Sequence, residues 1–282
     1  MPHALRTFIL RQAGLSELCA RASGNAAARI ALIDGAVDSS HPALQGCRIT
    51  KIGNSRSTRA DQHATFGASI LMTSETDQRS GRSMGICSRS TLFNFAVVTD
   101  EMLTGGRSIR EVAKTLATAV SLAVQAHCKI ILFGIEVRHS ESCEWRTLRE
   151  SLQGALAAGS VGIFPAGNRS GGPDVVQCRW PEAVVVASHN WRGIPSLFSP
   201  LMGGGVNTVF APGENVPGAG PGSGYVVRSG TSFAAAIAAG AFALATCVLR
   251  ACSVFEIAVK LCPRPHRVLD GTVLLGEMAH TF

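Results

Sequence analysis

Short runs of apolar residues alternate along this chain with longer segments in which apolar residues return every three or four positions. Short runs rich in β-branched and aromatic residues indicate buried strands, and the three-to-four spacing indicates amphipathic helices. We predict strands at 29–34, 91–98, 129–135, 161–167, 183–188 and 207–212, and helices at 61–73, 107–127, 145–158 and 231–249. Because the two kinds of element alternate, the predicted fold is α/β: a three-layer, doubly wound, mostly parallel sheet with helices on both faces.

The pattern predicts one large domain at 29–282, preceded by an N-terminal extension at 1–28 that we expect to be helical. A chain of 282 residues can bury a single large core, and no linker-like segment divides it. The densest glycine and proline patch, "APGENVPGAGPGSG" at 211–224, is interpreted as a loop. Beyond residue 253 we expect a helix near 255–261 and a strand at "TVLL", 272–275.

Charge and composition exclude several classes of protein. The net charge of +7 is spread along the chain rather than gathered in blocks, so no nucleic-acid surface is expected. The segment 233–249 is uncharged but short for a membrane span and rich in alanine, and we interpret it as a buried helix. Nine cysteines without a C-x-x-C pair indicate reduced thiols, and no secretory signal is evident, so a cytoplasmic location is expected.

Four polar residues interrupt or end the apolar segments. Asp34 ends the strand "RIALID", His63 lies in "DQHATFGASILM", Asn168 follows the strand "VGIFPAG", and Ser232 begins the helix in "SGTSFAAAIAAG". Each has an ordinary structural interpretation, because Asp and Asn form turns and Ser and His cap helices. Asp38, a little further along, is interpreted as a turn former only. At the carboxyl edge of a parallel sheet, however, the four side chains can meet and act together.

In the order Asp, His, Asn, Ser, these residues resemble the subtilisin-like serine proteases, the subtilases, over residues 29–250. The resemblance rests on five segments, which are "ALIDGAVDSSHPAL", "HATFGASI", "PAGN", "FAPGENV" and "SGTSFAAAIAAG". It implies that Ser232 is the nucleophile, that His63 is the general base and then acid, and that Asp34 orients the imidazole. Asn168 and the backbone N–H of Ser232 would stabilise the oxyanion.

The resemblance also implies that a peptide substrate is bound as an added β-strand between two segments of the enzyme. One segment would be Thr104–Arg107, with Gly105 and Gly106, and the other Gly134–Glu136. Glu136 is a departure, since the family usually has a serine, a hydrophobic residue and a glycine in the second segment. We expect Glu136 to favour a basic residue before the scissile bond, the alternative being that its side chain points to solvent.

The His segment departs from the family's His-Gly-Thr-His, because this chain has Ala64 and Phe66 in place of the glycine and the second histidine. That change, together with Glu136 in the second substrate segment, leaves open a catalytically inactive subtilase fold that serves as a peptide-binding or interaction module. The segment "IDGAVDSSHPAL" is similar to the corresponding segment of the proteases that mature ribosomally made peptide natural products, including the cyanobactin proteases. Family members often bind calcium, but no acid-rich loop suited to it stands out. No cofactor is expected to be required.

Overall fold

The computed structural model describes residues 23–53, 57–76, 84–136, 143–170, 179–200 and 207–249, with stretches of one to three residues outside these ranges. The expected N-terminal helix lies for the most part outside the described residues. So does most of the helix expected near 255–261, and the strand expected at 272–275 lies wholly outside them.

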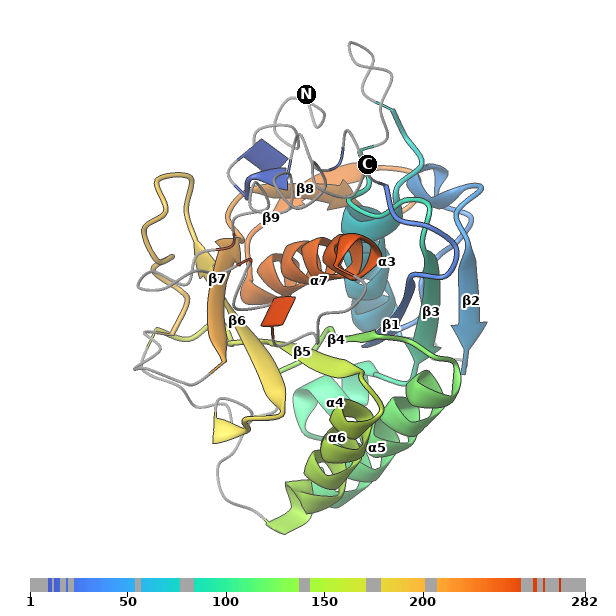
Figure 1. Cartoon of the computed structure of the whole chain (residues 1–282), viewed down its shortest axis with the longest axis vertical. Coiled ribbons are helices and arrows are strands. Elements are labelled where there is room, and N and C mark those ends of the chain that lie inside the picture. The colour runs from blue at the N-terminus through green and yellow to red at the C-terminus, as the bar shows by residue number, and fades with distance from the viewer. Residues whose placement is uncertain are drawn as a thin grey trace.

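A seven-stranded parallel sheet forms the centre of the molecule (Figure 1). Its strands run in the order β2-β3-β1-β4-β5-β6-β7, and each neighbouring pair is parallel. The strands are β1 (Arg29–Asp34), β2 (Ile49–Ile52), β3 (Thr91–Ala96), β4 (Ile130–Phe133), β5 (Val161–Pro165), β6 (Ala183–His189) and β7 (Thr208–Pro212). All six strands predicted from apolar runs are therefore present.

The order of the strands reverses at β1. The chain runs from β1 to β2 at the edge of the sheet and returns to β3, which lies between them. It then crosses to the other side of β1 with β4 and the strands beyond it. In open parallel sheets, the carboxyl ends of the strands on either side of such a reversal diverge, and binding sites form between them. Asp34 ends β1 and Gly134 follows β4, so both lie at this point.

Helices cover both faces of the sheet, which confirms the predicted three-layer arrangement (Figure 1). The helices α3 (Thr58–Met72) and α7 (Thr231–Val248) pack together over one face, where the larger apolar core lies. The helices α5 (Ile109–Gln125) and α6 (Arg146–Ala157) pack against each other over the opposite face and bury a second core. In α5, a Ser108–Glu111 capping box begins the helix at Ile109.

Several elements were not predicted, including the strand β2 at the edge of the sheet. The short helix α4 (Asp100–Thr104) follows β3, and a two-stranded antiparallel ribbon pairs β8 (Val216–Ala219) with β9 (Tyr225–Arg228). The interpretation of residues 211–224 as a loop was therefore wrong for β8. Glycine in this strand serves a close approach, because a Cβ on Gly218 would lie 2.9 Å from the Phe66 ring. Single-turn 3₁₀ helices occur at Pro42–Leu44 and Cys143–Trp145.

The helix α7 is the uncharged segment that resembled a membrane span. It is surrounded by β4, β5, β6, β7 and α3, and most of its side chains are buried in the larger core. Within the part of the chain that the structure describes, no helix is long and apolar enough to cross a bilayer. Among the described cysteines, Cys128 is buried and unpaired, and burial raises the pKa of its thiol to about 12.

Candidate active site

Asp34 provides a buried carboxylate at the carboxyl end of β1. It is 1% exposed, and its Oδ1 accepts a hydrogen bond from the backbone N–H of Gly35 at 2.8 Å. The loop after β4 passes directly against the other oxygen, because a Cβ built on Gly134 would overlap Oδ2 and Cγ of Asp34. Glycine at 134 is therefore needed for Asp34 to keep its position.

His63 lies in the second turn of α3, which begins at Thr58 and not near residue 61 as predicted. His63 therefore does not cap the start of this helix. The additional turn is stabilised from another element, since the Asp100 carboxylate of α4 accepts from the backbone N–H groups of Arg59 and Ala60 at 3.3 and 2.9 Å. In return, the Asp100 N–H donates to the Ser57 hydroxyl at 3.1 Å. Such caps satisfy N–H groups that have no partner inside a helix.

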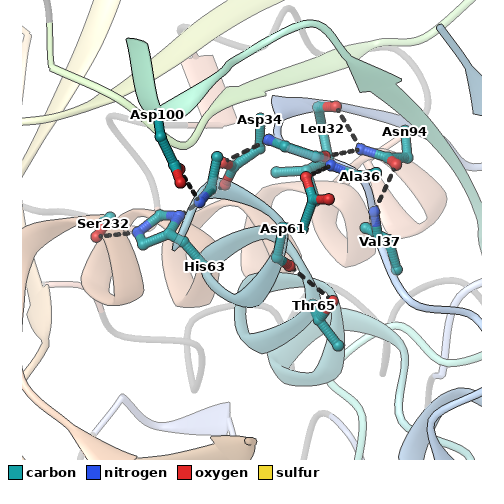
Figure 2. Close-up of polar contacts among 12 residues, drawn as sticks. Leu32, Asp34, Ala36, Val37, Asp61, His63, Thr65, Asn94, Asp100 and Ser232 are labelled. Atoms are coloured by element: carbon teal, nitrogen blue, oxygen red, sulfur yellow. Dashed lines mark hydrogen bonds and ion pairs between the residues drawn. The ribbon is translucent and has the colours of Figure 1, made fainter. Parts of the chain in front are cut away.

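The imidazole of His63 joins Asp34 to Ser232 (Figure 2). Its Nδ1–H donates to Asp34 Oδ2 at 2.7 Å, and its Nε2 accepts from the Ser232 hydroxyl at 3.0 Å. Burial acts to lower the pKa of His63, but the charge of Asp34 and its hydrogen bond outweigh burial, so the pKa lies above its ordinary value. The side chain remains 24% exposed, so a bound substrate can reach it.

Ser232 is the second residue of α7, which begins at Thr231 after Gly230. The residue at the N-cap position, Gly230, has no side chain, and the Ser232 hydroxyl points to His63 rather than to the backbone of the first turn. This geometry contradicts the interpretation of Ser232 as a helix cap. The amino end of α7 carries the partial positive charge of the helix dipole, which favours negative charge developing nearby.

Asn168 follows β5 and is held by Thr231. Its Oδ1 accepts from the Thr231 backbone N–H at 2.9 Å and lies 3.3 Å from the Thr231 hydroxyl. The same hydroxyl accepts from the Gly167 N–H at 3.0 Å, which ties the turn after β5 to the start of α7. With Oδ1 fixed in this way, the amide NH₂ of Asn168 is turned away from Thr231 and is exposed.

The altered residues of the His segment are accommodated by packing. Ala64 is fully buried in α3, and the Phe66 ring lies 4.4 Å from the Phe233 ring, centre to centre. Phe233 in turn lies 5.5 Å from the imidazole of His63. Phe66 thus fills the space behind His63 with apolar contacts, and the hydrogen bonds of His63 to Asp34 and Ser232 are both present.

A model of the subtilase family matches residues 25–255. This chain belongs to the subtilase family. The match covers all five segments that carry the resemblance, and it makes the protein a subtilisin-like serine protease. A search of curated proteins found no match to this subtilase.

Solved structures share the fold. The prenylagaramide maturation protease PagA is 22% identical with a TM-score of 0.77, over 94% of this chain and 98% of its own. The PatG macrocyclase in complex with peptide is 18% identical with a TM-score of 0.79, over 94% and 95%. The MycP3 protease from the type VII (ESX-3) secretion system is 21% identical with a TM-score of 0.74, over 95% and 87%.

A cleft of about 710 Å³ opens at the four polar residues of this subtilase. The cleft is lined by Asp34, His63, Asn168 and Ser232, and by Gly105, Gly134 and Glu136 of the expected substrate segments. Glu136 is half-buried there. Gly105 ends α4 with a φ of 82°, a left-handed conformation that suits glycine. Gly106 is not among the lining residues, and its N–H donates to the Glu101 carbonyl at 2.9 Å.

Sequence reasoning missed two residues that position this site, Thr231 and Asp100. Thr231 directly precedes Ser232, but its hydrogen bond to a side chain 63 residues away leaves no local sequence pattern. Asp38 forms the expected turn, because its carboxylate accepts from the Ser40 N–H at 2.9 Å, and hydrogen bonding to the Ser40 hydroxyl lowers its pKa. Among the residues that the structure describes, no group of three His, Cys, Asp or Glu side chains could hold a metal ion.

Proposed function

We propose that this subtilase is an endopeptidase that hydrolyses peptide bonds through an acyl-enzyme on Ser232. The observation that carries the proposal is the continuous hydrogen-bonded chain from Asp34 through His63 to the Ser232 hydroxyl, with contacts of 2.7 and 3.0 Å. A serine hydroxyl is a weak nucleophile, and a neutral imidazole within hydrogen-bond reach is the kind of base that activates it.

In the first half of the reaction, Ser232 Oγ attacks the substrate carbonyl carbon and its proton passes to His63 Nε2. The imidazolium then gives this proton to the leaving amine, the C–N bond breaks, and the acyl group remains on Ser232. In the second half, water attacks the ester with His63 again as base, and Ser232 recovers its proton. Asp34 keeps Nδ1 protonated throughout and stabilises the imidazolium through its charge.

The negative oxygen of each tetrahedral intermediate would be stabilised by two donors, the NH₂ of Asn168 and the backbone N–H of Ser232. Thr231 supports this role by holding Asn168 Oδ1, so the donor is oriented before substrate arrives. Each step uses side chains and backbone groups of the chain itself, and the proposed reaction therefore requires no cofactor.

The substrate would lie in the cleft as an added strand between the segments at 104–107 and 134–136. Backbone pairing would supply affinity and the cleft walls specificity. Glu136 supports a preference for a basic residue before the scissile bond, since its half-buried side chain lines the cleft. The backbone N–H of Gly106 already donates to the Glu101 carbonyl. Gly106 would therefore pair with the substrate through its own carbonyl, or only after this hydrogen bond breaks.

We propose limited cleavage of precursor peptides as the physiological reaction. The support is the similarity in fold to proteins described as maturation proteases, PagA and PatG, over at least 94% of this chain. The alternative of an inactive binding module rested on the altered His segment. Phe66 and Ala64 fit behind His63 while both of its hydrogen bonds are kept, so the geometry favours the enzyme.

A fluorophosphonate probe tests the proposal directly, because it labels only a serine activated as a nucleophile. The folded protein should react rapidly, Ser232→Ala should not react, and Ser229→Ala, which changes an exposed neighbouring hydroxyl, should still react. Hydrolysis of a quenched-fluorescent peptide library by the same three proteins supplies the second readout. A folded protein that neither reacts nor cleaves would support the binding-module alternative.

A further inference from the structure

Two arginines of the cleft stand beside the reacting groups. Arg228 ends β9, four residues before Ser232, and Arg59 lies one helical turn before His63 on α3. Both line the cleft. Their charge reaches the imidazole, since each acts to lower the pKa of His63 against the larger effect of Asp34. Two positive charges therefore act on the space around His63.

Arg228 is held in place by packing rather than by an acid. Its guanidinium carbon lies 5.5 Å from the centre of the Phe66 ring, a cation–π distance. Phe66 is fully buried and packs on Phe233, so the surface that supports the guanidinium is rigid. Stacking of this kind leaves the N–H groups of the guanidinium at its edge available for a ligand.

The carboxylates of Asp34 and Asp100 are already engaged by other groups of the protein. Asp34 binds His63, and the Asp100 carboxylate accepts from backbone N–H groups at the start of α3. Within the described ranges, neither Arg59 nor Arg228 has a carboxylate within ion-pair distance, whereas Arg107 on the other side of the cleft pairs with Glu101 at 3.3 Å. Arg228 thus presents a cation that the folded protein leaves available to a substrate.

The position of β9 indicates which part of the substrate Arg228 would meet. The β8–β9 ribbon lies across the molecule from α4 and the end of β4 (Figure 1). Those two elements carry Gly105 and Gly134, which would hold the substrate before the scissile bond. Gly134 lies against Asp34, at the Nδ1 end of the imidazole, whereas Arg228 precedes Ser232 by four residues and stacks on Phe66, which packs on Phe233. Arg228 therefore approaches the scissile bond from the Ser232 end of the site, on the side of the departing segment.

We infer that Arg228 selects substrates that carry a carboxylate within the first two residues after the scissile bond. This inference rests on the proposed function, because it assigns substrate chemistry to the same site. The carboxylate would belong either to an Asp or Glu side chain or to the free C-terminus of a short leaving segment. A guanidinium recognises both through paired N–H donors.

Matched peptides test the inference. Peptides amidated at a distant C-terminus would differ only by Asp against Asn at the first or second position after the scissile bond. We expect kcat/KM to favour Asp about tenfold, the size of one partly exposed charge-assisted contact. In Arg228→Gln the ratio should fall toward one, and in Arg228→Lys it should be partly restored. A second pair of short peptides, one with a free C-terminal carboxylate and one with a C-terminal amide, tests whether Arg228 recognises the C-terminus of the leaving segment.

The control is Arg192→Gln, which also removes an arginine stacked on an aromatic ring, 4.4 Å from Trp191, but does not line the cleft. Its Asp-to-Asn ratio should equal that of the unaltered protein. Equal kcat/KM values for the Asp and Asn peptides would overturn the inference and leave the proposed protease activity intact. A preference for acidic residues only before the scissile bond would do the same. Failure to cleave any peptide would instead contradict the proposed function.

Discussion

The direction in which the Asn168 amide faces is set by Thr231. The backbone N–H of Thr231 can only donate, so the atom of Asn168 that it contacts at 2.9 Å must be the amide oxygen. The NH₂ group is then directed away from α7. One backbone contact therefore decides that Asn168 presents donors to the cleft, and the catalytic importance of this amide can be measured.

Replacing Asn168 with Ala should lower kcat by roughly a hundred- to a thousandfold, with little change in KM, because the donor acts on charge that develops only in the transition state. Steady-state kinetics on one cleaved peptide would measure the change. Asn168→Asp keeps the shape but replaces the donors with a negative charge, so it should be at least as slow. A substantial kcat for Asn168→Asp would contradict an oxyanion role.

The protonation of His63 should control the acid side of the pH profile. Cleavage requires neutral His63, and its raised pKa places the midpoint of the rise in kcat/KM above the ordinary value of about 6.5. Asp34→Asn removes the charge that raises the pKa, so the midpoint should fall, and kcat should fall by roughly 10⁴. The matched variant Asp38→Asn removes an exposed turn carboxylate and should leave the midpoint in place. An unmoved midpoint in Asp34→Asn would contradict the assignment of this limb to His63.

Glu136 should set the preference at the residue before the scissile bond. We expect Lys and Arg substrates to exceed their Gln counterpart in kcat/KM by about tenfold, and Glu136→Gln to remove most of this difference. Profiling of a peptide library with both proteins would measure it. Glu150→Gln, on the exposed side of α6, provides the control for loss of one negative charge. A library without preference for Lys or Arg would indicate that Glu136 has no part in selecting substrate.

At the scale of elements, α4 and α3 stabilise each other. Asp100→Ala removes the acceptor of two N–H groups at the start of α3 and should lower the free energy of unfolding by about 1 kcal/mol. Because α3 carries His63, kcat should fall as well. Urea denaturation and kinetics would give the two values. Glu101→Ala, which breaks an exposed ion pair with Arg107, should cost less than about 1 kcal/mol. Equal losses in the two variants would contradict a capping role for Asp100.

The sequence predicted the elements that have strong local patterns. The six predicted strands lie in apolar runs, and helix α5 shows clear three-to-four spacing. The strand β2 was missed because its "ITKI" alternates poorly and is largely exposed, and β8 because proline and glycine occupy half of it. The start of α3 was misplaced because its cap, Asp100, comes from another element. A sequence pattern reports neighbours along the chain, whereas these features depend on residues that are neighbours only in the folded structure.

The candidate site could be read from the sequence for a different reason. Asp34, Asn168 and Gly134 follow strands β1, β5 and β4, and parallel strands bring their carboxyl ends to one edge. The resemblance to subtilases supplied the pairing of these residues with His63 and Ser232. It gave no information on Arg228, because the support that Phe66 gives to its guanidinium appears only when β9 is placed against α3.

For the whole molecule, stability should depend on the protonation of His189 in β6. Burial lowers its pKa, outweighing the opposite effects of the Asn190 carbonyl and Glu214, so the unfolded chain binds a proton more readily than the folded one. The free energy of unfolding should therefore fall as pH drops through about 6.5 and below. Denaturation of His189→Gln between pH 5 and 7 should show a shallower dependence than the unaltered protein.

The control for this prediction is His127→Asn, since His127 is exposed and asparagine tolerates its φ of 56°. Its pH dependence should follow that of the unaltered protein. The raised pKa of His63 has the opposite sign, with stability lost as pH rises through it, but it is common to all three proteins and cancels in the comparison. Parallel curves for His189→Gln and the unaltered protein would show that His189 does not contribute.

The contact between Gly134 and Asp34 has a consequence for redesign of this enzyme. Residue 134 belongs to the wall that would contact the substrate, yet any side chain there would collide with the Asp34 carboxylate that holds His63. A substitution at position 134 that altered the choice of substrate would therefore also displace Asp34 and lower turnover. Directed evolution of cleavage preference should recover diverse residues at 136 and only glycine at 134.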